Sequence, residues 1–258
     1  MTTSLRMKLE QYTAFSAAEC PRVDALSRYP SEVFAAGEMI LSEGEKVGQI
    51  HLITQGFATR SKTLRDGTRQ IVAFMIPGDL CDLEVFVLEG MDHDIVAMTD
   101  TTCVLIPVPD IVELLSEMST LTMALWWSTM TDSAVLRSRI VDQGRREAPE
   151  RLAHLFYELL IRYRVIGMAA DNAYPLPLTQ EGLADAAGMS PVHANRSLRQ
   201  MRSEGLATFE RGVVSVLDAA GLKQAAGFEA DYLHLIRSER ESDVSSRAGD
   251  LIQGVSRN

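Results

Sequence analysis

The 258-residue chain carries a formal net charge of −10, with 46% hydrophobic and 23% charged residues, a composition typical of a soluble protein long enough to form two domains. No apolar run approaches the roughly twenty residues of a membrane helix, and residues 1–15 lack a signal-peptide core, so we expect a cytoplasmic protein with no membrane partner. Cys20, Cys81 and Cys103 are too few and too scattered for a disulfide framework or a four-thiolate metal site.

The N-terminal part of the chain predicts a short helix followed by a small antiparallel β-domain. Residues 17–27 have an amphipathic helical pattern that Pro30 closes. Between residues 33 and 108, short alternating runs are separated by turn residues, a pattern that favours a β-barrel or jelly roll. Asp66–Gly67 is the strongest hairpin signal in the chain. The expected strands are residues 39–42, 49–54, 58–62, 70–75, 94–98 and 103–108.

A long helix is predicted next, because residues 111–143 contain neither Gly nor Pro. A break at Ser119–Thr120 divides this segment into a short and a long helix. An apolar stripe on the long helix, interrupted by Arg137, consists of Met123, Trp127, Met130 and Ala134. The stripe is either a dimer seam or the face that rests on the β-domain. We favour the seam, since a long helix beside a small β-domain has little else to cover both of its faces.

After a further helix at residues 148–165, residues 177–203 predict two helices with a tight turn at Gly188. In the second helix, Ser190 is a suitable N-cap and Pro191 occupies the first helical position. The inward positions are Ala194, Leu198 and Met201. The remaining face suits a DNA major groove, because residues 190–203 hold three Arg and no carboxylate in an acidic chain. That face consists of Val192, His193, Asn195, Arg196, Arg199 and Arg202.

Two short strands, residues 207–209 and 213–217, predict a β-wing after the helix pair. Its turn holds Arg211, which either contacts a DNA phosphate or is solvated. An apolar stripe at Ala225, Phe228, Tyr232 and Leu235 predicts one more docked helix, and the polar chain beyond Ser238 is expected to be disordered.

A small β-domain, a long helix and a winged helix-turn-helix in this order resemble the CRP/FNR family of bacterial transcription regulators, over about residues 10–221. The local stretches that carry the resemblance are Gly67–Ile71, Pro77–Leu80, Glu150–Leu155, Leu178–Gln180 and Val192–Arg196. The last of these, Val-His-x-Asn-Arg, is similar to the recognition helix of one subgroup of the family.

The resemblance implies an α+β protein with four regions. These are a cyclic-nucleotide-binding-like jelly roll or barrel acting as sensor (residues 1–110), a linking and dimerisation helix (111–145), a winged helix-turn-helix (146–221) and a C-terminal helix and tail (222–258). It further implies a homodimer that binds a palindromic site in double-stranded promoter DNA and contacts RNA polymerase. The alternative is a signalling module of the same architecture that acts through protein partners rather than DNA.

Individual DNA contacts follow from matching the family motif to this chain. Thr179 and Ser190 occupy phosphate-contacting places, while Pro191, Val192 and Arg196 occupy base-reading places. The outward residues His193 and Asn195 are further candidates for base reading, and Arg199 and Arg211 for phosphate contact. Ser197 stands where the motif usually has an aliphatic residue.

The effector is expected to differ from cyclic AMP. In cyclic-nucleotide-binding relatives, a Gly-Glu pair and an Arg-Ser pair hold the ribose and the phosphate. The matching residues, our effector-pocket candidates, are Asp82, Leu83, His93 and Asp94. The phosphate-binding Arg is therefore missing, and a carboxylate at position 94 repels a phosphate.

Other cofactors and catalysis are also not expected. Cys20 stands alone in the N-terminal region, where relatives with an iron–sulfur cluster need several cysteines. Haem bound through His51 or His93 is not favoured. The histidines form no H-x-H or H-E-x-x-H pattern, and G-x-S-x-G, P-loop and G-x-G-x-x-G motifs are absent, so we expect neither a metal site nor an enzyme. A different small ligand, a protein partner and no ligand all remain open.

Overall fold

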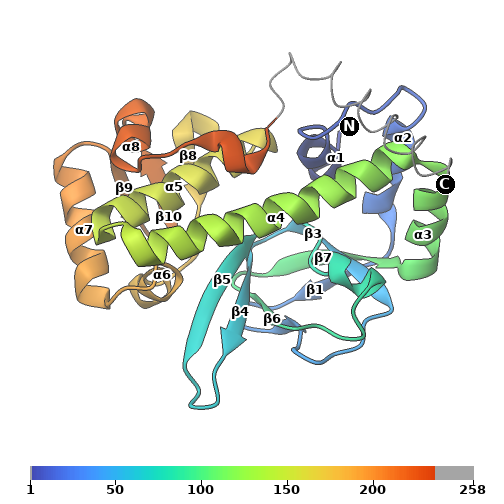
Figure 1. Ribbon diagram of the computed structural model, residues 1–258, viewed down its shortest axis with the longest axis horizontal. Coiled ribbons are helices and arrows are strands. Elements are labelled where there is room, and N and C mark those ends of the chain that lie inside the picture. Colours follow the sequence, from blue (N-terminus) through green and yellow to red (C-terminus); the bar gives the residue numbers. More distant parts are fainter. Residues whose placement is uncertain (1, 236–258) are drawn as a thin grey trace, which may run out of the picture.

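The computed structural model describes residues 2–235, and the tail expected beyond Ser238 lies outside them. The N-terminal β-domain is a jelly roll of two antiparallel sheets, ordered β1–β7–β3 and β2–β6–β4–β5 (Figure 1). A shared apolar core with residues from all seven strands lies between the sheets, which do not close into a barrel. The strands are β1 (Ser31–Phe34), β2 (Met39–Leu41), β3 (Gln49–Gln55), β4 (Ala58–Thr63), β5 (Arg69–Met75), β6 (Asp94–Ala97) and β7 (Thr101–Pro107).

All six strands predicted from alternation are present, but β1 was not predicted. Three of its four residues are exposed, Val33 among them, so the strand carries no alternating pattern. The hairpin at Asp66–Gly67 is confirmed. Gly67 has a φ of 86°, a backbone conformation that glycine adopts without a Cβ clash. The Thr68 N–H donates to Asp66 Oδ1 at 2.9 Å and closes the turn.

Short N-terminal helices cover one end of the jelly roll. They are α1 (Ser4–Leu9), α2 (Cys20–Ala25) and the 3₁₀ turn η1 (Leu26–Arg28). A separate 3₁₀ turn, η2 (Leu83–Phe86), follows β5. The predicted helix at 17–27 corresponds to α2 and η1, whereas α1 was not predicted. Leu5 and Leu9 of α1 are each 1% exposed, so this helix is held by packing rather than by its own length.

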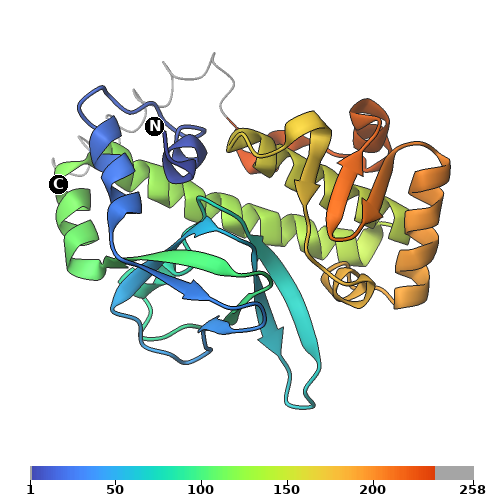
Figure 2. The same ribbon diagram turned by 180° about the vertical axis from the view of Figure 1, so that it is seen from behind.

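Helix α4 (Ser119–Arg145) runs along the whole molecule, with the β-domain at one end and the C-terminal domain at the other (Figures 1 and 2). It follows α3 (Val108–Glu117), and the break between them falls at Met118, next to its predicted place. No helix in the described residues 2–235 has the length and apolar character needed to span a bilayer.

The predicted apolar stripe of α4 is wrong in two of its four positions. Ala134 is buried, and Trp127 packs inward, where its ring stacks on Tyr12 at 6.3 Å between centroids. The outward face instead carries Trp126 and Ile140, which are 61% and 71% exposed, together with Met123 and Met130. Neighbouring stripes of one helix share nearly the same spacing, so two adjacent Trp residues could not be assigned to faces from the pattern alone.

The C-terminal domain combines four α-helices with a three-stranded sheet of order β8–β10–β9. The predicted helix-turn-helix and wing are confirmed, whereas β8 was not predicted. The elements are α5 (Ala148–Val165), η3 (Ala170–Asn172), β8 (Ala173–Pro175), α6 (Gln180–Ala186), α7 (Pro191–Ser203), β9 (Ala207–Glu210), β10 (Val213–Val216), α8 (Ala219–Ala225) and η4 (Ala230–Leu233).

The single docked helix predicted from the stripe 225–235 is wrong, because the segment is broken. Gly227, with a φ of 53°, ends α8, and the 3₁₀ turn η4 follows. Phe228 nevertheless inserts into the core, where its ring lies 4.8 Å from that of Tyr157. Packing of the apolar residues was thus predictable, but the helical conformation was not.

Candidate nucleic-acid interface and sensor site

Helix α7 is fixed by its cap and by its buried side. The Ser190 hydroxyl accepts from the His193 N–H at 3.4 Å, and Pro191 stands at the first position. Ala194, Ser197 and Met201 are buried against the rest of the domain. The hydroxyl of Ser197 therefore lies where the family motif has an aliphatic side chain, and the helix still packs closely there.

The opposite face of α7 points to solvent. Pro191, Val192, His193, Arg196 and Arg199 are all exposed, and Val192 is 75% exposed. Because no carboxylate lies on this helix, its surface is a compact cationic face of the size that fits a major groove.

Two polar residues of α7 are already engaged within the domain. The Asn195 side-chain amide donates to the Pro191 carbonyl at 3.1 Å. Arg202 forms an ion pair with Glu210 of β9. Arg196 and Arg199 thus remain the arginines of α7 for which the described residues 2–235 supply no ion pair.

The turn of the helix-turn-helix is held by an arginine that was not predicted from the sequence as a functional residue. Arg151 of α5 donates from Nη1 to the carbonyls of Ala187 and Gly188, both at 2.9 Å. Its Nη2 donates to the carbonyls of Gln143 and Arg146 at 3.3 and 3.1 Å. One guanidinium therefore ties the turn before α7 to the end of α4. Arg151 lies within Glu150–Leu155, one of the stretches that carry the family resemblance. That motif is the feature of the sequence from which its role could have been predicted.

The remaining phosphate candidates lie at the edges of the same surface. The Thr179 hydroxyl caps α6 by accepting from the Gly182 N–H at 3.0 Å. Arg211 is exposed at the tip of the wing between β9 and β10, with a φ of 52°. Thr179 caps α6, Ser190 and Arg199 are the cap and a later residue of α7, and Arg211 lies in the wing.

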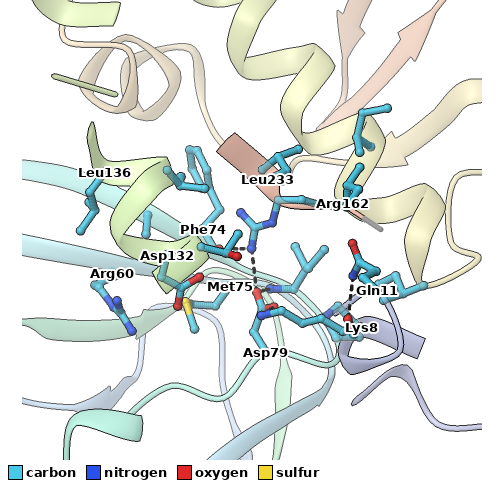
Figure 3. A pocket seen from close by; sticks show the side chains of 18 residues that line it. Lys8, Gln11, Arg60, Phe74, Met75, Asp79, Asp132, Leu136, Arg162 and Leu233 are labelled. Atoms are coloured by element: carbon cyan, nitrogen blue, oxygen red, sulfur yellow. Dashed lines mark hydrogen bonds and ion pairs between the residues drawn. The ribbon is translucent and has the colours of Figure 1, made fainter. Parts of the chain in front are cut away.

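A buried carboxylate joins the C-terminal domain to the β-domain. Asp79, which is 2% exposed, accepts from Lys8 Nζ at 2.6 Å and from Arg162 Nη2 at 2.8 Å (Figure 3). It also accepts from the Ile76 N–H at 2.8 Å. Burial alone would raise the pKa of Asp79, but the charges of Lys8 and Arg162 outweigh this and hold the pKa below its usual value.

Further contacts join α6 to the β-domain and α5 to α4. The Gln70 side-chain amide of β5 donates to the Asp185 carbonyl of α6 at 2.6 Å, and Arg69 lies 3.5 Å from the Asp185 carboxylate. On α5, the fully buried Glu158 pairs with Arg139 of α4 at 3.0 Å and accepts from the Tyr232 hydroxyl at 2.9 Å.

The effector-pocket candidates divide into two pairs. Asp82 is completely buried and engaged by His51, which donates its backbone N–H at 2.9 Å and places Nδ1 2.7 Å from Asp82 Oδ2. Leu83 lines a cavity of about 60 Å³ between the turn after β5 and α4. Arg60 and Glu84 line the same cavity, and neither was predicted from the sequence as a pocket residue.

The second pair lies at the start of β6. Asp94 accepts from the Glu43 N–H at 2.8 Å. His93 is buried, with Nδ1 on Asp92 and no partner for Nε2 among the described residues. Burial lowers the pKa of His93, and the positive charge of Arg60 lowers it further.

Within residues 2–235, no three His, Cys, Asp or Glu side chains are grouped as a metal site would require. The buried Cys81 and Cys103 are free thiols. Burial raises the pKa of both, to about 12 for Cys103, so neither is a reactive thiolate at neutral pH.

Family models match both domains of the chain. A model described as a cyclic nucleotide-binding domain matches residues 31–118, and one described as a Crp-like helix-turn-helix domain matches residues 150–225.

Curated relatives match most of the chain. The transcriptional activator protein FnrL of Cereibacter sphaeroides is 25% identical over 202 residues, which cover 77% of this chain and 81% of FnrL. The nitrogen fixation regulation protein FixK of Bradyrhizobium diazoefficiens is 26% identical over 215 residues, which cover 83% and 88%. The structure of FixK2 from Bradyrhizobium japonicum has the same fold, with a TM-score of 0.69 at 23% identity, covering 78% of this chain and 98% of FixK2.

The Asp79 contacts predict a pH-dependent loss of stability. Asp79→Asn leaves Lys8 and Arg162 without their buried counter-charge, so we expect the free energy of unfolding at pH 7 to fall by about 3 kcal/mol. Because the folded pKa of Asp79 is lowered, its contribution is present above the unfolded pKa of about 4 and is lost as the pH falls through the folded value. Urea unfolding should therefore show the gap between wild type and variant closing in acid.

Asp66→Asn is the matched control, because Asp66 lies at the exposed hairpin tip and an Asn amide oxygen can still accept from the Thr68 N–H. Equal stability of wild type and Asp79→Asn at pH 7 would show that the carboxylate does not join the domains.

Proposed function

This chain belongs to the CRP/FNR family of transcription regulators, and we propose that it acts as a homodimer that reads a palindromic promoter site through Arg196. The observation that carries the proposal is the exposed, acid-free face of α7 on a packed helix-turn-helix, in a chain of net charge −10. A cationic recognition helix on an otherwise acidic protein concentrates DNA affinity at one surface. The β-domain is the sensor and α4 is the dimerisation helix.

Each residue of the interface has a proposed part. Arg196 pairs with a guanine in the major groove, because its guanidinium can donate to O6 and N7 together. Pro191 and Val192 supply shape and apolar contact, while His193 and the free carbonyl oxygen of Asn195 reach neighbouring base edges. Thr179, Ser190, Arg199 and Arg211 contact phosphates. We further propose that the chain belongs to the subgroup with a Val-His-x-Asn-Arg recognition helix, because residues 192–196 carry that motif.

Family membership supports three further proposals. The protein is cytoplasmic, it contacts RNA polymerase at its promoters, and it is not an enzyme. Its regions are the sensor (residues 1–110), the linking and dimerisation helix (111–145), the winged helix-turn-helix (146–221) and the C-terminal segment (222–258).

Arg196→Ala should remove sequence discrimination, while Arg199→Ala should weaken binding to every sequence alike. We expect Arg196→Ala to lose about 1–3 kcal/mol of preference for the selected site over a scrambled one. Arg199→Ala should keep that preference and lower the salt slope of binding by about one. Fluorescence anisotropy with both duplexes over a salt series measures the two effects. Unchanged discrimination by Arg196→Ala would refute the proposed readout.

The outward face of α4 supports dimerisation with a second copy. The spacing of a coiled-coil seam, with steps of three, four, seven and three residues, connects Met123, Trp126, Met130, Arg137 and Ile140. Arg137 occupies one seam position and opposes deep burial there. The exposed Trp126 and Ile140 in this stripe present apolar area to water. Pairing with an identical helix removes that area from water.

A charge placed on this seam should dissociate the dimer. We expect Ile140→Glu to give a folded monomer, because two buried carboxylates would face each other across the twofold axis. Size-exclusion chromatography with light scattering measures the mass, and circular dichroism checks the fold. Val33→Glu is the matched control: Val33 is 65% exposed on β1, away from α4. A dimeric Ile140→Glu variant would place the interface elsewhere.

The sensor is proposed not to respond to cyclic AMP. Asp82 and Asp94 are engaged in hydrogen bonds within the β-domain, and His93 is buried. The cavity at Leu83 has a volume of about 60 Å³, well below the roughly 150 Å³ of a cavity that binds benzene. A nucleotide does not fit there without displacing α4 or the turn after β5.

Cyclic AMP at about 1 mM should therefore leave the melting temperature unchanged. A ligand with a Kd of about 10 µM would add about 2.7 kcal/mol at this concentration, a shift of a few degrees. Binding of a palindromic promoter fragment, which should raise the melting temperature, shows that the assay responds. A saturable rise with cyclic AMP would contradict the proposal.

A further inference from the structure

The segment that follows α8 crosses back from the C-terminal domain to α4. This segment, residues 226–235, is called the strap below. It contains η4 and runs from α8 toward the middle of the molecule, where Figure 1 draws it in red. The turn η4 packs against α4. The strap therefore connects the C-terminal domain to α4 independently of the covalent junction at residues 146–147.

Aromatic side chains hold the strap on α5. Phe228 is 2% exposed, and its ring lies 5.1 Å from the ring of His154 and 4.8 Å from that of Tyr157. Tyr232 stacks on the same His154, with 5.9 Å between the ring centroids and 19° between the ring planes. The buried imidazole of His154 thus contacts both aromatic rings of the strap.

A hydrogen bond also ties the strap to the ion pair between α5 and α4. The two oxygens of the buried Glu158 have different partners. Oε1 accepts from Arg139 of α4 at 3.0 Å, and Oε2 accepts from the Tyr232 hydroxyl at 2.9 Å. Burial and the negative charge of Glu158 raise the pKa of Tyr232, so this hydroxyl stays protonated and donates. When the strap undocks, Glu158 loses this donor, and a buried carboxylate oxygen without a donor is costly.

The end of the strap contacts α4 far from the junction with α5. Leu233 is 3% exposed and belongs to the same apolar core as Val135 of α4. The ring of His234 lies edge-on to that of Trp127, with 5.6 Å between the centroids. Trp127 precedes Arg145, the last residue of α4, by about five helical turns, or about 27 Å. A contact at this distance from the junction resists rotation of the C-terminal domain about it.

We propose that the strap fixes the angle between the C-terminal domain and α4, and thereby the separation of the two recognition helices in the dimer. This positioning role rests on the proposed function. Two α7 helices enter successive major grooves only when their separation matches the helical repeat of DNA. Because α4 pairs the subunits and α5 carries α7, a free angle between α4 and α5 would let that separation vary. A docked strap holds the binding geometry in advance and reduces the entropy lost on binding.

Tyr232→Phe tests the docking of the strap without DNA, because it removes the hydroxyl that Glu158 accepts from and keeps the ring. Hydrogen exchange of residues 226–235, measured by mass spectrometry on the full chain, should become about tenfold faster, since a hydrogen bond to a charged group shifts an opening equilibrium by at least about this factor.

Tyr29→Phe is the matched control, because its hydroxyl donates to the Asp110 carboxylate at 3.0 Å on an exposed surface between the N-terminal segment and α3. It should leave the exchange of the strap unchanged. Exchange in Tyr232→Phe as slow as in wild type would overturn the docking of the strap through Glu158.

The positioning role is tested with two duplexes, the selected palindrome and the same half-sites separated by a few additional base pairs. Only a molecule with an undocked strap can fit the longer spacing, so the affinity for it follows the population of that state. Tyr232→Phe should therefore bind the longer duplex up to about tenfold more tightly than wild type and Tyr29→Phe do. Damage to the fold cannot produce such a gain. Binding to a single half-site should be equal in all three proteins, because each α7 is intact.

The outcomes separate this inference from the proposed function. If all three proteins bind the selected palindrome but Tyr232→Phe gains no affinity for the longer duplex, the positioning role is overturned alone. If none of them binds either duplex, the proposed function is overturned, and the positioning role falls with it, while the exchange measurement still decides whether Tyr232 holds the strap.

Discussion

The relation between the two domains depends on one buried carboxylate. Asp79 lies in the turn after β5 and is reached by Lys8 from α1 and by Arg162 from α5. A charge removed from water must be matched by counter-charges at short distance, and Asp79 is matched only when all three segments meet. The turn of the β-domain therefore fixes where α5 lies. Since α5 carries the helix-turn-helix, that turn also fixes where α7 points.

Buried carboxylates paired with arginines also occur along α4. Glu158 of α5 is buried with Arg139 of α4 as its counter-charge, and Asp142 of α4 pairs with Arg146 at the start of the next segment. Burial would raise the pKa of Asp142, but His154 and the neighbouring arginines hold it below its usual value. Polar and charged residues thus occur on the buried face of α4 as well as on the exposed one. This is why its apolar periodicity was a poor guide to which side faces the molecule.

The sequence allowed most local structure to be predicted, because local structure depends on nearby residues. Alternation located six strands, Asp66–Gly67 located the hairpin, and Ser190 with Pro191 located the start of α7. Strand β1 was not predicted because its side chains are mostly exposed. The segment after α8 was misread because an apolar stripe specifies burial, whereas Gly227 determines the backbone path.

Contacts between residues far apart in the chain could not be predicted in the same way. Asp79 was noticed as part of a family motif, yet its partners lie 71 and 83 residues away along the chain. Arg60 and Arg151 look like ordinary surface arginines until the fold buries one and aims the other at the turn before α7. The outward face of the recognition helix was predictable because it follows from helix periodicity alone. The sensor cavity was not, because it is assembled from segments far apart in the chain.

Phe74 of β5 connects these features physically. Its carbonyl accepts from Arg162 Nη2 at 2.9 Å, and its ring lies 5.5 Å below the guanidinium of Arg139. On the other side, its neighbour Ala73 is the ladder partner of Arg60. The strand residues that pair with Arg60 therefore adjoin the residue that holds α5 and α4. Coupling between distant sites needs packed, contiguous contacts of this kind together with an element that can take two positions. Arg146 stands between α4 and α5, and its carbonyl accepts from Arg151. This junction is where the chain can take two positions.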